Sequence, residues 1–215
     1  FESDSFRLVV DPYMSNCLEK LQSLPRMHPF PVALKELKPD ALLATHDHLD
    51  HLDPDTVMMI RMTYPACVYG GPRRSYDHFL KLEIPPEMTT LLTPAESVSF
   101  GPFRITPVFA AHSDPTGCGF LIEAEGKKVY LSGDTCYDER LLSDTVKNVD
   151  LMLVCINGKL NNMNAEEALR CVKELKPKAA LPMHIGLFAV NTADPSVFVD
   201  GCRKMGVNSF AMTPG

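Results

Sequence analysis

The densest group of metal-ligating side chains in the sequence is the run THDHLDH at 45–51, which holds three histidines and two aspartates. Neutral imidazoles bind zinc, iron, nickel and manganese, and a carboxylate adds the negative charge that a divalent ion needs. One short turn could therefore direct ligands at two neighbouring ions, which together favour hydrolysis. The alternative is a solvated polar turn. Only 7 of the 215 residues are histidine, so three within six positions argue against it.

The order His-x-His-x-Asp-His at His46, His48, Asp50 and His51 resembles the signature of the metallo-β-lactamase superfamily. More narrowly, residues 44–53 (ATHDHLDHLD) resemble the L-ascorbate-6-phosphate lactonase family. The superfamily resemblance implies three further ligands, in the order His, Asp, His. Each of them should stand at the carboxyl end of a strand.

Three later segments fit that expectation. The predicted strand 104–110 precedes His112, 128–131 precedes Asp134, and 179–182 precedes His184. Taken singly, these residues could equally be a capped loop histidine, a turn former after a glycine, and a core histidine. Together with the run at 45–51 they place ligand chemistry at four strand ends, where α/β proteins gather their sites.

By resemblance, the first ion would be held by His46, His48 and His112, and the second by Asp50, His51 and His184, with Asp134 bridging them. The resemblance carries no cysteine ligand, and none occurs at these positions. Two divalent ions are therefore expected. The donor set fits zinc, manganese or iron, and the lactonase family is associated with manganese, so zinc and manganese are the candidates. Asp50 could also orient the attacking water or shuttle its proton.

Composition predicts a single compact domain spanning residues 1–215. The hydrophobic fraction is 45% and the charged fraction 22%, as in ordinary globular proteins. Seven scattered cysteines form no disulfide pattern, which favours a reducing, cytoplasmic environment. The net charge of −6 argues against nucleic-acid binding, and no apolar run is long enough to span a membrane. Whether copies of the chain assemble is left open.

Strand and helix patterns alternate along the chain, and the resemblance implies an α/β fold in four αββα layers. Residues 1–11 predict a turn and a strand. In the superfamily such a strand follows another, so we expect an amino-terminal strand to be missing. Asn164 and Glu167 predict a capping box for a helix at 165–175. A last helix is predicted at 194–205 and a last strand at 208–213.

Four residues near strand ends are candidates for substrate contact. Arg73 and Arg74 follow a glycine turn and could bind a phosphate, because guanidinium groups suit that anion; solvated surface is the alternative. Asn157 and Lys159 follow the apolar strand 150–156, where a turn role is equally open. The proline-rich segment 25–31 could be a lid over the site or a surface connector.

These patterns predict a metallohydrolase and leave three functions to compare. The first is opening of a lactone, an anionic sugar lactone such as L-ascorbate 6-phosphate. The second is phosphodiester hydrolysis, as in the phospholipase D-like or tRNA-processing (RNase Z-like) relatives. The third is di-iron redox chemistry, although redox relatives tend to replace an early histidine with a carboxylate, which this sequence does not do.

Overall fold

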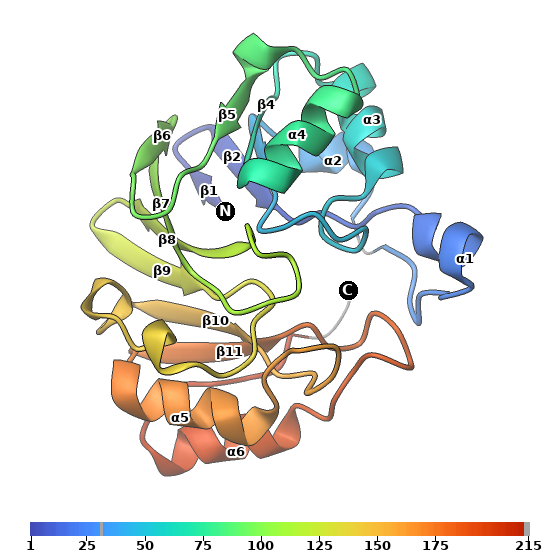
Figure 1. Cartoon of the computed structure of the whole chain (residues 1–215). Helices are drawn as coiled ribbons and strands as arrows, with labels where there is room; N and C mark the ends of the chain where they lie inside the picture. The colour runs from blue at the N-terminus through green and yellow to red at the C-terminus, as the bar shows by residue number, and fades with distance from the viewer. Residues whose placement is uncertain (31, 213–215) are drawn as a thin grey trace.

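Two β-sheets pack face to face with helices on both outer sides, as the computed structural model shows for residues 1–30 and 32–212 (Figure 1). The first sheet has the order β1-β2-β3-β4-β5, with bounds β1 Glu2–Ser3, β2 Phe6–Val10, β3 Ala41–Leu43, β4 Val68–Gly71 and β5 Thr89–Leu91. Strands β2 to β5 are parallel, and β1 is antiparallel to β2. The first sheet thus directs the carboxyl ends of four strands to one edge.

The second sheet has the order β11-β10-β9-β8-β7-β6. Its bounds are β6 Val98–Phe100, β7 Phe103–Phe109, β8 Cys118–Ala124, β9 Lys127–Leu131, β10 Leu151–Cys155 and β11 Ala179–Met183. Strands β9, β10 and β11 are mutually parallel, whereas β6 to β9 are antiparallel neighbours. Because β7 and β9 both run antiparallel to β8, they end at the same edge.

Helices complete the four layers. The helices are α1 Cys17–Gln22, α2 Leu34–Leu37, α3 Pro54–Thr63, α4 Arg73–Lys81, α5 Ala165–Leu175 and α6 Ser196–Lys204, with short 3-10 turns η1 Pro86–Met88, η2 Glu139–Leu141 and η3 Asp144–Val146. In Figure 1, α2, α3 and α4 lie beside the first sheet, and α5 and α6 lie against the second. The expected αββα fold is confirmed.

Three apolar clusters hold the layers together. Leu8 and Leu43 of the first sheet meet Ile105 and Phe120 of the second in a core between the sheets. A second cluster joins the outer face of the second sheet to α5 and α6, and a third joins the first sheet to α3 and α4. Burial on both faces explains why the strands have near-continuous apolar sequences.

The predicted last strand is wrong over the described residues 208–212. Only Asn208 bridges Ala179 of β11, and Phe210 and Met212 are 59% and 53% exposed. No apolar surface covers these two side chains, so pairing residues 209–212 with β11 would bury no further apolar area. Thr213 lies outside the described residues. The last helix is also shorter than predicted and begins at Ser196. The expected strand before Phe1 stays a prediction.

None of the helices in the described ranges is long and apolar enough to cross a membrane.

The capping box of α5 gives a first prediction. Asn164 accepts a hydrogen bond from the Glu167 amide at 2.9 Å, and the Glu167 carboxylate accepts one from the Asn164 amide at 3.0 Å. Asn164→Ala removes the first bond and should lower the free energy of unfolding by about 1 kcal/mol. Urea unfolding measures this, with exposed Glu166→Ala as the control. Equal stability of the two variants would contradict the prediction.

Candidate metal centre

The turn that follows β3 carries four of the predicted ligands and is fixed at both ends. The amides of His51 and Leu52 both donate to the carbonyl of His48, at 2.9 and 2.7 Å. After the turn, buried Asp53 caps α3 by accepting from the Asp55 amide. This compact turn brings His46, His48, Asp50 and His51 to the edge where the parallel strands end.

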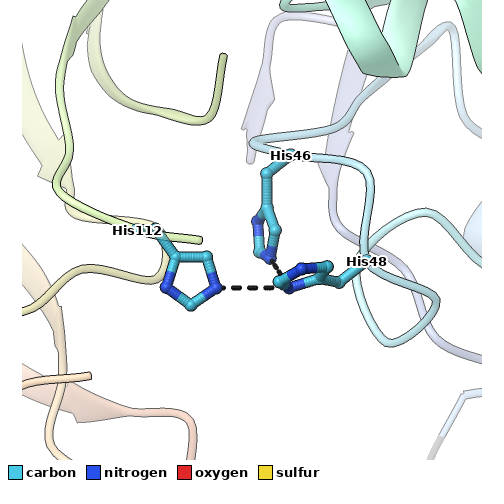
Figure 2. Close-up of side chains that lie close together, drawn as sticks. All are labelled: His46, His48 and His112. Atoms are coloured by element: carbon cyan, nitrogen blue, oxygen red, sulfur yellow. Dashed lines mark hydrogen bonds between the residues drawn. The ribbon is translucent and has the colours of Figure 1, made fainter. Parts of the chain in front are cut away.

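Three imidazole nitrogens converge at the first part of the centre (Figure 2). His46 Nε2 lies 3.0 Å from His48 Nδ1, and His112 Nε2 lies 3.2 Å from the same atom. His46 and His48 come from the turn after β3, whereas His112 follows β7 on the other sheet. The two sheets thus each contribute to one trio of donors.

Outer hydrogen bonds determine which imidazole nitrogen faces inward. The Thr45 hydroxyl donates to Asp11 Oδ2 at 2.6 Å and therefore accepts from His46 Nδ1 at 3.0 Å. His112 Nδ1 donates to the carbonyl of Asn161 at 3.4 Å. The inward Nε2 atoms of both histidines consequently carry lone pairs, the form that ligates metals.

The second part of the centre contains carboxylates. Asp50, His51 and His184 form a trio, and His51 also groups with His46 and Asp134. Asp134 Oδ1 lies 3.4 Å from His51 Nε2, and its Oδ2 lies 3.1 Å from His184 Nε2 and 3.8 Å from His112 Nε2. Asp134 therefore lies between the two trios. The structure brings all seven predicted ligands together.

The spacing of these atoms fits divalent ions. Nitrogen ligands about 2.0–2.1 Å from a tetrahedral ion stand about 3.3 Å from one another. The observed nitrogen separations are 3.0, 3.2 and 3.3 Å. Nitrogen atoms held this close must share either a proton, in a hydrogen bond, or a metal ion. The donor chemistry and the spacing therefore agree with a metal centre.

The protonation states of the histidines in the centre also suit metal binding. Burial lowers the pKa of His46 and of His112, which keeps both imidazoles neutral. Burial also opposes charge on His184, but hydrogen bonds to Asp134 and Asp50 outweigh it and raise the pKa of His184 to about 9. The pKa of His51 is likewise raised, by three carboxylates acting against burial. The carboxylate side thus retains positive charge.

Asp11 is a functional residue that the sequence reasoning missed. It follows β2, and its Oδ2 accepts from His51 Nδ1 at 2.8 Å. Its Oδ1 accepts from the Thr45 amide at 2.7 Å. Asp11 thereby orients His51 directly and His46 through the Thr45 hydroxyl. Its place at a strand's carboxyl end, directly before a proline, was the signal that could have identified it.

The loop after β10 supports the centre from the other sheet. Buried Asn162 donates its Nδ2 to Asp134 Oδ2 at 2.7 Å, and Asn161 accepts from His112 through its carbonyl. Leu160 and Asn161 hold φ angles of +52° and +63°, a conformation that costs a residue other than glycine roughly 1 kcal/mol. Asn161 and Asn162 were not among the site candidates predicted from the sequence.

The four substrate-contact candidates have different surroundings. Arg73 pairs with Asp77 at 3.3 Å, and Arg74 Nε lies 3.8 Å from buried Asp114. Neither arginine lines the pockets that contain the ligands. Asn157 is buried and lines none of those pockets, but it donates to Asn191, which lines two of them. Lys159 alone lines one of them, and its Nζ donates to the carbonyl of Val190 at 3.0 Å.

Pockets open on two sides of the centre. One, here called the apolar pocket, has a volume of about 370 Å³ and borders Asp50, His51, Asp134 and His184. The other, the polar pocket, has about 250 Å³ and borders His48, Asp50, His112 and Asp134. It adjoins a groove of about 610 Å³ that contains Lys159. Asp50 lines all three, so a substrate on either side would meet it.

Comparison with known proteins agrees with this geometry. The family profile of the beta-lactamase superfamily domain matches residues 6–185. The chain belongs to the metallo-β-lactamase superfamily. Among its relatives, a UPF0173 metal-dependent hydrolase from Natranaerobius thermophilus is 34% identical, with 97% of this chain and 89% of the relative covered. Another from Thermococcus onnurineus is 31% identical, covering 90% and 84%.

A solved structure shows the same fold. The metallo hydrolase Igni18 from Ignicoccus hospitalis superposes with a TM-score of 0.80 at 23% identity, covering all of this chain and 90% of that one. That structure shows the fold, and the family profile and the two curated relatives identify the protein as a metal-dependent hydrolase of the superfamily. Its seven ligand candidates lie within the range of the family profile.

Asp11 provides a prediction about metal affinity. Asp11→Asn keeps the size of the side chain but removes the charge that supports His51. We expect the affinity for the more weakly bound ion to fall by about 10- to 100-fold, as for other partners of metal-bound histidines. Competition with a fluorescent chelator measures it. Asp40→Asn, at the opposite end of β3, is the control, and an unchanged affinity in Asp11→Asn would refute this role.

Proton release is a second prediction. His184, with a pKa near 9, and His51, with a raised pKa, carry protons at neutral pH in the metal-free protein. Metal ions must displace those protons, so binding should strengthen as pH rises from 6.5 towards 9. Calorimetry with manganese in buffers of different ionisation enthalpy counts the protons released. Binding that is independent of pH and buffer would disprove the prediction.

Proposed function

We propose that the protein hydrolyses a carboxylic ester bond, most specifically that of a lactone, with two divalent ions. The observation that carries this proposal is the pair of ligand trios that meet at Asp134. Two ions bound there would supply activation of water and polarisation of the substrate carbonyl. Zinc and manganese are the proposed ions because the donors are imidazole and carboxylate.

The charges around the centre favour a neutral carbonyl substrate over a phosphodiester. Among the described residues, Arg26 and Lys159 are the only arginine or lysine side chains that line the three pockets. Each already donates to a backbone carbonyl, Arg26 to Tyr13 and Lys159 to Val190. Arg73 and Arg74 pair with carboxylates elsewhere. The proposal therefore includes the lactone but not a phosphate on it.

The chain's own residues would have separate roles in this reaction. Asp50 Oδ2 lies 3.6 Å from His51 Nε2 and 3.5 Å from His184 Nε2. From this position its carboxylate can ligate an ion and accept a hydrogen bond from the attacking water. On the polar side, the Ser113 hydroxyl lines the pocket and lies 3.4 Å from His48 Nε2. It is a donor within reach of a leaving oxygen.

The working environment is part of the proposal. All seven cysteines are free thiols, and six of them are buried. Burial raises the pKa of Cys155 and of Cys171 to about 12, so these thiols stay protonated and unreactive. We infer a reducing, cytoplasmic environment, in which such thiols persist.

Elemental analysis joined to an activity panel tests the function. The panel contains unsubstituted and phosphorylated sugar lactones, alkyl lactones, aryl esters and phosphodiesters, each with and without added manganese. We expect two ions per chain and turnover of the neutral lactones and esters. His48→Ala should lower bound metal and reduce kcat/KM by more than about 100-fold, because it removes a ligand rather than a ligand's partner.

Exposed Asp200→Ala is the control for general effects of substitution. Turnover of phosphodiesters alone by a two-metal protein would retain the centre and reject the substrate class. A protein that binds no divalent ion at any pH would reject the metal-dependent mechanism.

A further inference from the structure

The apolar pocket begins at the ligands of the second trio and extends between loops of the two sheets. Besides Asp50, His51, Asp134 and His184, the lining of this pocket is mostly apolar surface. The principal apolar side chains are those of Tyr13, Phe30, Met183, Ile185 and Leu187. A substrate whose carbonyl lies at the metal centre would place one substituent here, in contact with apolar side chains.

The walls of this pocket are held in place by the protein itself. The Arg26 guanidinium lies 5.0 Å from the centre of the Tyr13 ring and 5.7 Å from that of Phe30, and it donates to the Tyr13 carbonyl at 2.8 Å. The Met27 amide donates to the Leu187 carbonyl at 2.8 Å. These contacts connect the described part of the proline-rich segment to the loop after β11. The pocket is therefore preformed.

The polar pocket on the other side differs in chemistry. It is bordered by Ser113, Asn161 and Asn191, together with His48 and His112. A leaving alkoxide needs a proton, and hydroxyl and amide groups can donate hydrogen bonds to it, whereas carbon cannot. The leaving oxygen thus belongs on the polar side. The group on the acyl side of the carbonyl is then directed to the apolar pocket.

We propose that the apolar pocket is the acyl-binding site and that the substrates are esters and lactones with a short aliphatic chain or a single ring on the acyl side. This inference rests on the proposed function and specifies its substrate class. Water adds across the acyl C–O bond, so the products are a carboxylic acid and an alcohol, or one hydroxy acid from a lactone. Each methylene buried in the pocket should raise kcat/KM roughly three- to fourfold.

A chain-length series tests the assignment. For 4-nitrophenyl esters from acetyl to octanoyl, wild-type kcat/KM should rise with length until the pocket is full and then fall. Ile185→Phe occupies part of the pocket and should move the optimum to a shorter chain, with hexanoyl turnover reduced more than 10-fold relative to acetyl. Phe30→Ala, in the proline-rich segment that also lines the pocket, should move the optimum to a longer chain.

Met62→Phe is the control, because Met62 on α3 is 81% exposed and borders none of the three pockets. It should leave the position of the optimum unchanged. An optimum that does not shift in Ile185→Phe or Phe30→Ala, or that shifts equally in Met62→Phe, would overturn the acyl-site assignment while ester hydrolysis itself still stood. A flat profile in the wild type would overturn it equally.

Binding of product analogues gives a readout that does not need turnover. Hexanoate should bind the metal-loaded protein at least 10-fold more tightly than acetate by calorimetry, and Ile185→Phe should abolish that difference. If the two-metal protein cleaves only phosphodiesters, the proposed function fails, and this measurement still decides the pocket. Equal affinity for hexanoate and acetate in the wild type would reject an apolar binding site there.

Discussion

The centre depends on a repulsion that the fold imposes and that only positive charge relieves. The two sheets bring His46 Nε2 and His112 Nε2 to 3.0 and 3.2 Å from His48 Nδ1, and Asp50 and Asp134 lie beside them. In the metal-free protein, protons on His51 and His184 offset the two carboxylates. Divalent ions would take the place of those protons and would bind ligands from both sheets, so metal binding and sheet packing would be coupled.

Precise placement of the ligands requires unusual backbone conformations. Gly133 has a φ of +60°, and a Cβ there would lie 3.0 Å from the Cys118 carbonyl, so glycine is needed directly before Asp134. His184 and Asp11 have φ angles of +59° and +50° without being glycine. Such conformations cost on the order of 1 kcal/mol each and persist where surrounding contacts fix them. The hydrogen bonds of Asp11 are one such set of contacts.

The ligands could be predicted from the sequence because their information is local. Four lie in one turn, and His112, Asp134 and His184 each follow a strand whose apolar pattern is visible. Asp11 and Asn162 act through partners 40 and 28 residues away along the chain; the strand end before Pro12 marks the position of Asp11, but no local pattern reports either partner. Arg73 and Arg74 stand at a strand end, yet Asp77 and Asp114 draw them away from the ligand pockets. The segment 208–212 failed as a strand because burial, not propensity, decides strand formation there.

The difference between the two sides of the centre limits what the enzyme can bind. Besides the metal ions, a phosphorylated sugar would need a cationic side chain for its phosphate, whereas the Arg26 guanidinium contacts the Tyr13 carbonyl and two aromatic rings. That arginine stabilises a wall instead of offering a site for an anion. The same contact that makes the pocket rigid therefore also makes it apolar. Under the proposed function, the preference for a neutral substrate would follow from how the loop before α2 is anchored, independently of the metal ligands that the superfamily shares.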